Sequence, residues 1–442
     1  MEIPDKDLYL PKLQFARFGY QVMGFGGVGP TAFVDPYSGT RLRSQGTGAR
    51  YNAFGGGYGT YDGSSSYGTE IYVKNPFNGT NVAKTGNMEF GKVDCGVASN
   101  GTTIISSGGW SEPSSTVPIA EGDRDHNWAN DGSGPYVVPK IEYITSSSGG
   151  NAGDWGDVHH YTEGYPGDTG ETADDEFYYG ANAVGEDGAT GFYACGNGRY
   201  SPGRAFTNEI WKISIASASD SVDWGSNNDY WKSYCTGISG YTGTQGTLDI
   251  RWLIMGGAKR DVTATSSGST TTYLEEVRYY TFASASSGDV FGNPHNTIYN
   301  MGGYYKTTGS NGTRAVAMGG GNVVDKDSGG SPGAGGDTGG EWQSHQGNTI
   351  EYYTVASTGN ATMFGDMTHT YMKGNGQACN GQYLESWGGY KYNDRPNDNA
   401  GGTNHTIVNQ ISIATTGNAV VNGAHIASGN SDIGNNGGTG SN

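Results

Sequence analysis

The segment that decides the fold reads Ile350-Glu-Tyr-Tyr-Thr-Val-Ala-Ser-Thr-Gly-Asn360-Ala-Thr-Met-Phe364-Gly365-Asp366. Alternating apolar residues, a Ser-Thr-Gly-Asn turn and a second short run that closes on an aromatic–Gly pair are typical of strand, turn and strand. The segment recurs at the same offset from Ile141 to Trp155-Gly156, from Ile210 to Trp224-Gly225 and from Val277 to Phe291-Gly292, and in looser copies from Glu70 to Phe90-Gly91 and from Val408 to Gly423. Recurrence of one supersecondary unit predicts a repeat architecture.

A second recurring pattern is a short strand that ends in paired glycine. Three copies share one spacing, from Asn100-Gly to Gly108-Gly109, from Asn311-Gly to Gly319-Gly320 and from Asn380-Gly to Gly388-Gly389, and related strand ends lie at Gly26-Gly27, Gly55-Gly56, Cys195-Gly196 and Gly256-Gly257. Glycine allows a turn with positive φ, or a close approach of two backbones where a Cβ atom would clash. The two patterns alternate along the chain, so each repeat is expected to supply about four strands.

Composition is consistent with an all-β fold. The chain has 442 residues, of which 79 are glycine and only 15% are charged, a composition that also occurs in disordered chains. Aromatic residues reach 12% and recur in register, which favours a packed structure. We expect a short N-terminal arm at residues 1–15, one β-sheet unit at 16–428, and a Gly/Asn-rich tail at 429–442 that is either a flexible end or an interaction arm.

The alternation of the two patterns resembles the kelch repeat, which has a strand ending in double glycine, a strand with tyrosine and a later tryptophan. The resemblance implies an all-β, kelch-like β-propeller of four-stranded antiparallel blades. Seven strand ends of the Gly-Gly type favour seven blades, with six as the alternative. In either case Trp155, Trp224, Phe291 and Phe364 are expected at equivalent positions.

Charge and hydropathy limit the kinds of partner that the chain can bind. A formal net charge of −18 argues against binding to a phosphate backbone, so no nucleic-acid partner is expected. No apolar run is long enough to span a membrane, and the first residues carry no secretory signal. The four cysteines are too few for a disulfide framework and are expected to be small, reduced, buried side chains.

Candidate binding residues lie in long loops after the Gly-Gly strands, at about 111–139, 258–274, 322–348 and 391–407, which should gather on one side of the ring. Aromatic side chains there could stack on sugar rings or pack against a protein, or could only hold their own loops in place. The candidates are Trp128, Tyr136, Trp342, His345, Tyr390 and Tyr392.

One acidic stretch, with Asp123, Asp125 and Asn127, is similar to the start of a calcium loop. It lacks the glycine at the sixth position and the glutamate at the twelfth, so calcium is left open only as a structural ion, and no cofactor is expected. Asp325 and Asp327 are weaker candidates.

No catalytic residue is predicted. The sequence has no Gly-x-Ser-x-Gly elbow and no phosphate loop. The Cys–Tyr and His set of kelch-type copper oxidases and the arginine cluster of sialidases cannot be identified either. We therefore expect a protein that is not an enzyme.

The segment from Ile350 to Asp366 is also similar to repeats in virion proteins of marine and cyanobacterial tailed phages. That resemblance implies a structural tail, fibre or capsid-surface protein, made in the host cytoplasm and present in several copies beside other virion proteins, with a host-surface glycan as a further ligand. The alternative is an extracellular lectin or carbohydrate-active propeller enzyme.

Overall fold

The computed structural model describes residues 51–54, 58–61, 64–67, 69–75, 77, 79, 81–89, 91, 95–100, 102–111, 136–137, 140–145, 150–158, 183–187, 189–194, 197–200, 203–206, 209–226, 232–233, 235–241, 250–255, 258–260, 271–273, 276–282, 288–295, 307–319, 321–325, 342–371, 376–379, 381–388, 390–391, 403–404, 406–424 and 440–441. Every regular element among them is a β-strand. No helix in these ranges is long and apolar enough to cross a membrane.

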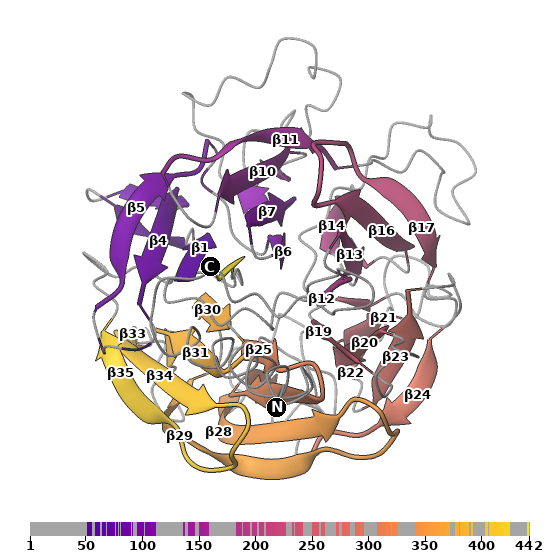
Figure 1. Cartoon of the computed structure of the whole chain (residues 1–442), viewed down its shortest axis with the longest axis vertical. Helices are drawn as coiled ribbons and strands as arrows, with labels where there is room; N and C mark the ends of the chain where they lie inside the picture. The colour runs from indigo at the N-terminus through magenta and orange to yellow at the C-terminus, as the bar shows by residue number, and fades with distance from the viewer. Residues whose placement is uncertain are drawn as a thin grey trace, which may run out of the picture.

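The strands form antiparallel sheets arranged in a ring, as in a β-propeller (Figure 1). Five sheets have four strands each. From the centre outward they are β36 (Gly440–Ser441), β1 (Tyr51–Phe54), β4 (Glu70–Lys74) and β5 (Ala83–Asn87); β6 (Gly96–Ser99), β7 (Thr103–Ser107), β10 (Lys140–Thr145) and β11 (Gly153–Asp157); β12 (Ala183–Glu186), β13 (Thr190–Ala194), β16 (Glu209–Ser214) and β17 (Val222–Ser226); β19 (Thr236–Tyr241), β20 (Ile250–Met255), β23 (Val277–Thr281) and β24 (Asp289–Gly292); and β30 (Gly376–Cys379), β31 (Tyr383–Trp387), β34 (Ile407–Ser412) and β35 (Val420–Ala424).

A further sheet, between those of β24 and β30, has five strands. It contains β25 (Thr307–Ser310), β26 (Arg314–Met318), the long β28 (Trp342–Thr354) and β29 (Thr362–Tyr371), and β27 (Gly321–Asp325) pairs with the first half of β28. Four of its strands, β25, β26, β28 and β29, have the same order as in the other sheets. The fifth strand, β27, is an extra strand beside the first half of β28.

The predicted number of four-stranded blades, seven or six, is therefore wrong for the described ranges, where five sheets have four strands and one has five. The strand before Gly55-Gly56 is β1, whose inner neighbour is β36 from the far end of the chain. The inner strand beside this Gly-Gly strand therefore comes from the far end of the chain. Gly26-Gly27, which suggested the additional blade, lies outside the described residues.

The aromatic–Gly pairs do occupy equivalent positions. Each of Trp155, Trp224, Phe291 and Phe364 lies in the outermost strand of a sheet, at a β-bulge opposite the equivalent residues of the third strand. In the sheet of β5 the matching glycine is Gly86, which pairs with Ile71, and not the expected Gly91. The aromatic residue of the motif is absent there. The sequence analysis therefore assigned the end of this copy too far toward the C-terminus.

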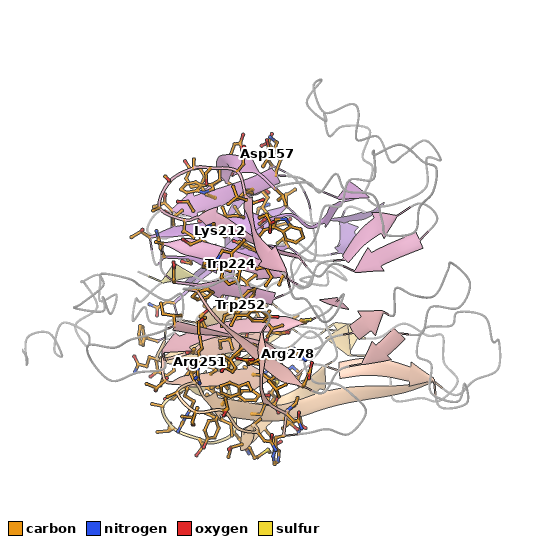
Figure 2. The ribbon with its side chains drawn as sticks, turned by 90° about the vertical axis from the view of Figure 1, so that its right-hand side faces the viewer. Asp157, Lys212, Trp224, Arg251, Trp252 and Arg278 are labelled. Atoms are coloured by element: carbon orange, nitrogen blue, oxygen red, sulfur yellow. The ribbon has the colours of Figure 1, made fainter. Side chains whose placement is uncertain are left out.

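The core lies between neighbouring sheets. One cluster joins Ile105 and Ile141 of one sheet with Tyr193 and Ile213 of the next. Another packs Phe192 of β13 against Trp252 of β20. The side chain of Trp252, which is labelled in Figure 2, is fully buried. Because each sheet buries its faces against its neighbours, the ring is required to hide the apolar side chains.

The bulge glycines and the turns of the next sheet form a repeated junction. A Cβ atom at Gly86, Gly292 or Gly365 would collide with the backbone of Gly150, Gly359 or Gly417. At five junctions within the described ranges, the backbone N–H after the bulge glycine donates to an Asn or Asp side chain of the next turn: Asn87 to Asn151 (3.0 Å), Asp157 to Asp220 (2.9 Å), Asn293 to Asn360 (3.0 Å), Asp366 to Asn418 (3.0 Å) and Ala424 to Asn81 (3.0 Å). The last of these joins the final sheet to the first and closes the ring.

Further strand pairs lie beyond the sheets. Each includes a strand that follows the second strand of a sheet, and β18, which precedes β19, joins one of them. They are β2 (Tyr58–Tyr61) with β3 (Ser64–Tyr67), β8 (Trp110–Ser111) with β9 (Tyr136–Val137), β14 (Asn197–Tyr200) with β15 (Gly203–Phe206), β18 (Lys232–Ser233) with β21 (Ala258–Arg260) and β22 (Thr271–Tyr273), β27 with the first half of β28, and β32 (Tyr390–Lys391) with β33 (Thr403–Asn404). We call these strands the outer hairpins.

Candidate binding face

The outer hairpins extend from one side of the ring, on the right in Figure 2, and define a face that we call the hairpin face. The loops after the Gly-Gly strands were expected to gather on one side, and the strands of these loops that the structure describes do lie on one side. The long loops nevertheless contain paired strands, which the sequence analysis did not predict.

The paired glycines direct the chain from each sheet into its hairpin. The first glycine of the pair has φ near +60° at Gly108, Gly319 and Gly388, with values of 63°, 62° and 67°. Its N–H donates to a carbonyl of the third strand, at 3.0 Å from Gly319 to Thr349 within β28 and from Gly388 to Ile407 at the start of β34. Left-handed backbone strongly favours glycine, so the conformation explains why the motif is Gly-Gly.

Four of the predicted binding residues have backbone positions in the outer hairpins. Tyr136 of β9 pairs with Ser111, and Tyr390 of β32 pairs with Asn404. Trp342 and His345 are both in β28, opposite Asp325 and Asn322. These four residues therefore come from three hairpins of one face, and their role in binding remains a prediction.

The other predicted site residues are outside the described ranges. Trp128 and Tyr392 belong to this group, as do the calcium candidates Asp123, Asp125 and Asn127. Within the residues that the structure describes, no group of three or more His, Cys, Asp or Glu side chains is placed to hold a metal ion. Calcium thus remains only a prediction from the sequence.

Buried polar side chains join the sheets close to the ends from which the hairpins leave. The side chains of Glu142, Glu351 and Asn409 occupy one position in three third strands. Each accepts a backbone N–H from the preceding sheet: from Glu89 (2.6 Å) and His295 (2.8 Å) after its outermost strand, and from Thr368 (3.1 Å) within β29. Burial raises the pKa of the neighbouring Tyr353 well above its ordinary value, and the Glu351 carboxylate raises it further. These acceptors hold neighbouring sheets in register beneath the face.

A buried ion pair lies where the last sheet meets the first. The Lys74 ammonium is 2.8 Å from Oε1 of Glu385, and both side chains are fully buried. Gln410 and Asn422 also donate to Oε1, at 2.8 and 2.7 Å, and the Trp387 indole donates to Oε2 at 2.8 Å. Burial raises the pKa of Glu385, and Lys74 together with the other donors offsets part of that rise.

No sequence motif pointed to this cluster. Lys74 and Glu385 are 311 residues apart, and only the closure of the ring brings them together. The carboxylate is surrounded by donors from β4, β31, β34 and β35, so its chemistry is that of a structural anchor. The buried cysteines Cys95, Cys235 and Cys379 form no disulfide and belong to separate core clusters.

The described geometry is therefore a rigid ring with buried polar junctions and a set of short hairpins on one side. Such an arrangement suits display of side chains to a ligand or partner, because loops and hairpins on a rigid scaffold are ordinary places for binding. The sequence matches no protein-family model and none of the curated proteins with which it was compared.

Proposed function

We propose that this chain is a non-enzymatic structural subunit of a phage virion, in a tail, fibre or capsid-surface position, and that its hairpin face contacts other virion proteins or a host-surface glycan. The assignment to a virion rests on the similarity of the segment from Ile350 to Asp366 to repeats of such proteins. A role in presenting side chains to a partner is supported by one observation: the outer hairpins lie on one side of the ring (Figure 2).

The outer rim of the ring supports assembly in several copies. Val290, Met363 and Val421 are exposed at 56%, 39% and 58% and hold the same position in the outermost strands of three consecutive sheets. An apolar row shared by adjacent sheets is suited to packing against a neighbouring subunit. A stable contact of this kind buries at least roughly 1,000 Å² in total.

A second function, a free glycan-binding lectin, is favoured by the aromatic residues of the hairpins. Tyr136, Trp342 and Tyr390 come from three different hairpins of one face. Aromatic rings on a rigid support can stack on sugar rings. This function needs no particle, and that difference separates the two proposals.

The experiment is mass spectrometry of particles purified by density gradient from the host that carries the gene. We expect the chain in the particles, in several copies relative to a single-copy virion protein. A double variant, Val290→Lys with Met363→Lys, should lower its incorporation, whereas Lys84→Asn on the exposed part of β5 should not. A chain that is absent from particles and free in the medium would refute the virion role and support the lectin.

A further inference from the structure

The outer hairpins of two neighbouring sheets concentrate positive charge in a chain whose net charge is −18. Strands β14, β15, β18, β21 and β22 contain five of the chain's 25 Lys and Arg residues and no Asp or Glu: Arg199, Arg204, Lys232, Lys259 and Arg260. The strands of the other outer hairpins hold one basic residue, Lys391. The charge is thus specific to one sector of the hairpin face.

Within this sector, like charges stand directly opposite each other. Arg199 of β14 pairs with Arg204 of β15, and Lys232 of β18 pairs with Lys259 of β21. Residues that pair directly in antiparallel strands share a face of the hairpin, and like charges at such positions are destabilising. Two cationic cross-strand pairs in adjacent hairpins therefore cost stability, a cost that an anionic ligand would offset.

The two hairpins belong to sheets that adjoin in the ring. The sheet of β13 packs on the sheet of β20 through Phe192 and Trp252. The next sheet on each side carries a hairpin without Lys or Arg in its strands, β8 with β9 before and β27 with β28 after. A ligand that bridges two separate cationic hairpins must be extended and must carry several negative charges.

We propose that the hairpins β14–β15 and β18–β21–β22 form a binding site for an acidic polysaccharide with sulfate or carboxylate groups. This inference rests on the proposed glycan-binding role of the hairpin face and names the class of glycan. A polysaccharide is chosen over a nucleic acid because it fits the glycan-binding role proposed for this face. The overall charge of −18 opposes any long polyanion outside this sector, so binding to a nucleic acid is an outcome of the test. Arg and Lys side chains suit both sulfate and carboxylate.

The test uses the full chain and two probes of equal length, dextran sulfate and neutral dextran. We expect salt-sensitive binding to dextran sulfate and none to neutral dextran, since counterion release makes binding to a polyanion weaken as salt rises. Replacing Arg199, Arg204, Lys259 and Arg260 with Gln should weaken binding by roughly tenfold or more. The control is Lys84→Gln with Lys212→Gln, which removes positive charge from β5 and β16, outside the hairpin face, and should leave binding unchanged.

A second measurement does not depend on the folding of a variant. Acylation of the wild-type lysines, read by mass spectrometry, should show protection of Lys232 and Lys259 by dextran sulfate and no protection of Lys84. Equal loss in the control variant, or unchanged binding in the fourfold variant, would overturn the proposal. It would also be overturned by tighter binding to single-stranded DNA of the same charge, or by lysines that are already protected without ligand. These measurements involve no particle, so a negative result would not affect the proposed virion role. Likewise, absence of the chain from particles would not affect the proposed polysaccharide site.

Discussion

Removing the Lys74 ammonium tests how the ring is held closed. The ammonium and Glu385 are 2.8 Å apart and fully buried, in the cluster that joins the last sheet to the first. Lys74→Met keeps the length of the side chain and leaves the carboxylate without its cation. Breaking a buried pair in this way costs about 3–5 kcal/mol, because an uncompensated charge stays in the interior.

The matched control is Lys84→Met, one strand away. Lys84 is 3.7 Å from Glu70, and its side chain is 50% exposed. An exposed pair contributes little, so the free energy of unfolding should change by less than about 0.5 kcal/mol. Urea unfolding followed by tryptophan fluorescence and far-UV circular dichroism gives both values.

The pH dependence gives the prediction a second readout. Burial already raises the pKa of Glu385, and loss of Lys74, which lowers it, must raise it further. A carboxyl group whose pKa is higher in the folded state than in the unfolded state favours folding when it is protonated. Its contribution to the free energy of unfolding is complete below the ordinary pKa and is lost as pH rises through the folded-state pKa. The Lys74→Met defect should therefore be smaller at pH 4 than at pH 7, and adding Glu385→Gln should recover much of it. A Lys74→Met protein as stable as Lys84→Met, or a defect independent of pH, would refute the reasoning.

Three further predictions concern the junctions and the hairpin face. Gly292→Ala should destabilise by about 1–3 kcal/mol through overpacking against the turn, whereas Gly359→Ala on the opposite side of that contact has open space and should be far milder in the same urea titration. Asn360→Ala should cost about 1 kcal/mol by removing a hydrogen-bond acceptor, and Asn360→Asp should be close to neutral because Asp220 makes the equivalent bond; equal losses would contradict this. Trp342→Ala should lower glycan binding on an array without shifting the unfolding midpoint, and unchanged binding would remove Trp342 from the proposed face.

Local patterns predicted the repeated elements well. The segment from Ile350 to Asp366 forms most of the pairing between β28 and β29, with its Gly-Asn turn between them, because strand and turn preferences are both local. The four aromatic–Gly pairs fell at equivalent bulges for the same reason. Where the aromatic was missing, as beside Gly86, the pattern gave the wrong register.

Long-range pairing could not be predicted in the same way. The contact of Tyr51 with Ser441 in β36 depends on closure of the ring, and so does the pair of Lys74 with Glu385. Neither leaves a local periodicity in the sequence. The predicted number of four-stranded blades differs from the described sheets for two other reasons. The count included Gly26-Gly27, which lies outside the described residues, and the sequence did not indicate that β27 adds a fifth strand to one sheet.

The candidate site was predicted only in outline. The sequence indicated which loops lie together, since all of them follow the same strand of the repeat. It did not indicate that Tyr136, Trp342 and Tyr390 lie in paired strands, because these hairpins are short and their partners are separated by long insertions. The cross-strand pairs Arg199–Arg204 and Lys232–Lys259 became visible only through the register.

Electron cryomicroscopy of purified particles tests the central claim most directly. The account predicts repeated copies of the ring on the particle, with the apolar rim of β24, β29 and β35 against a neighbouring subunit and the hairpin face turned to a virion partner or outward to the host. Particles that contain no such ring, or copies attached with the apolar rim of β24, β29 and β35 fully in solvent, would contradict it.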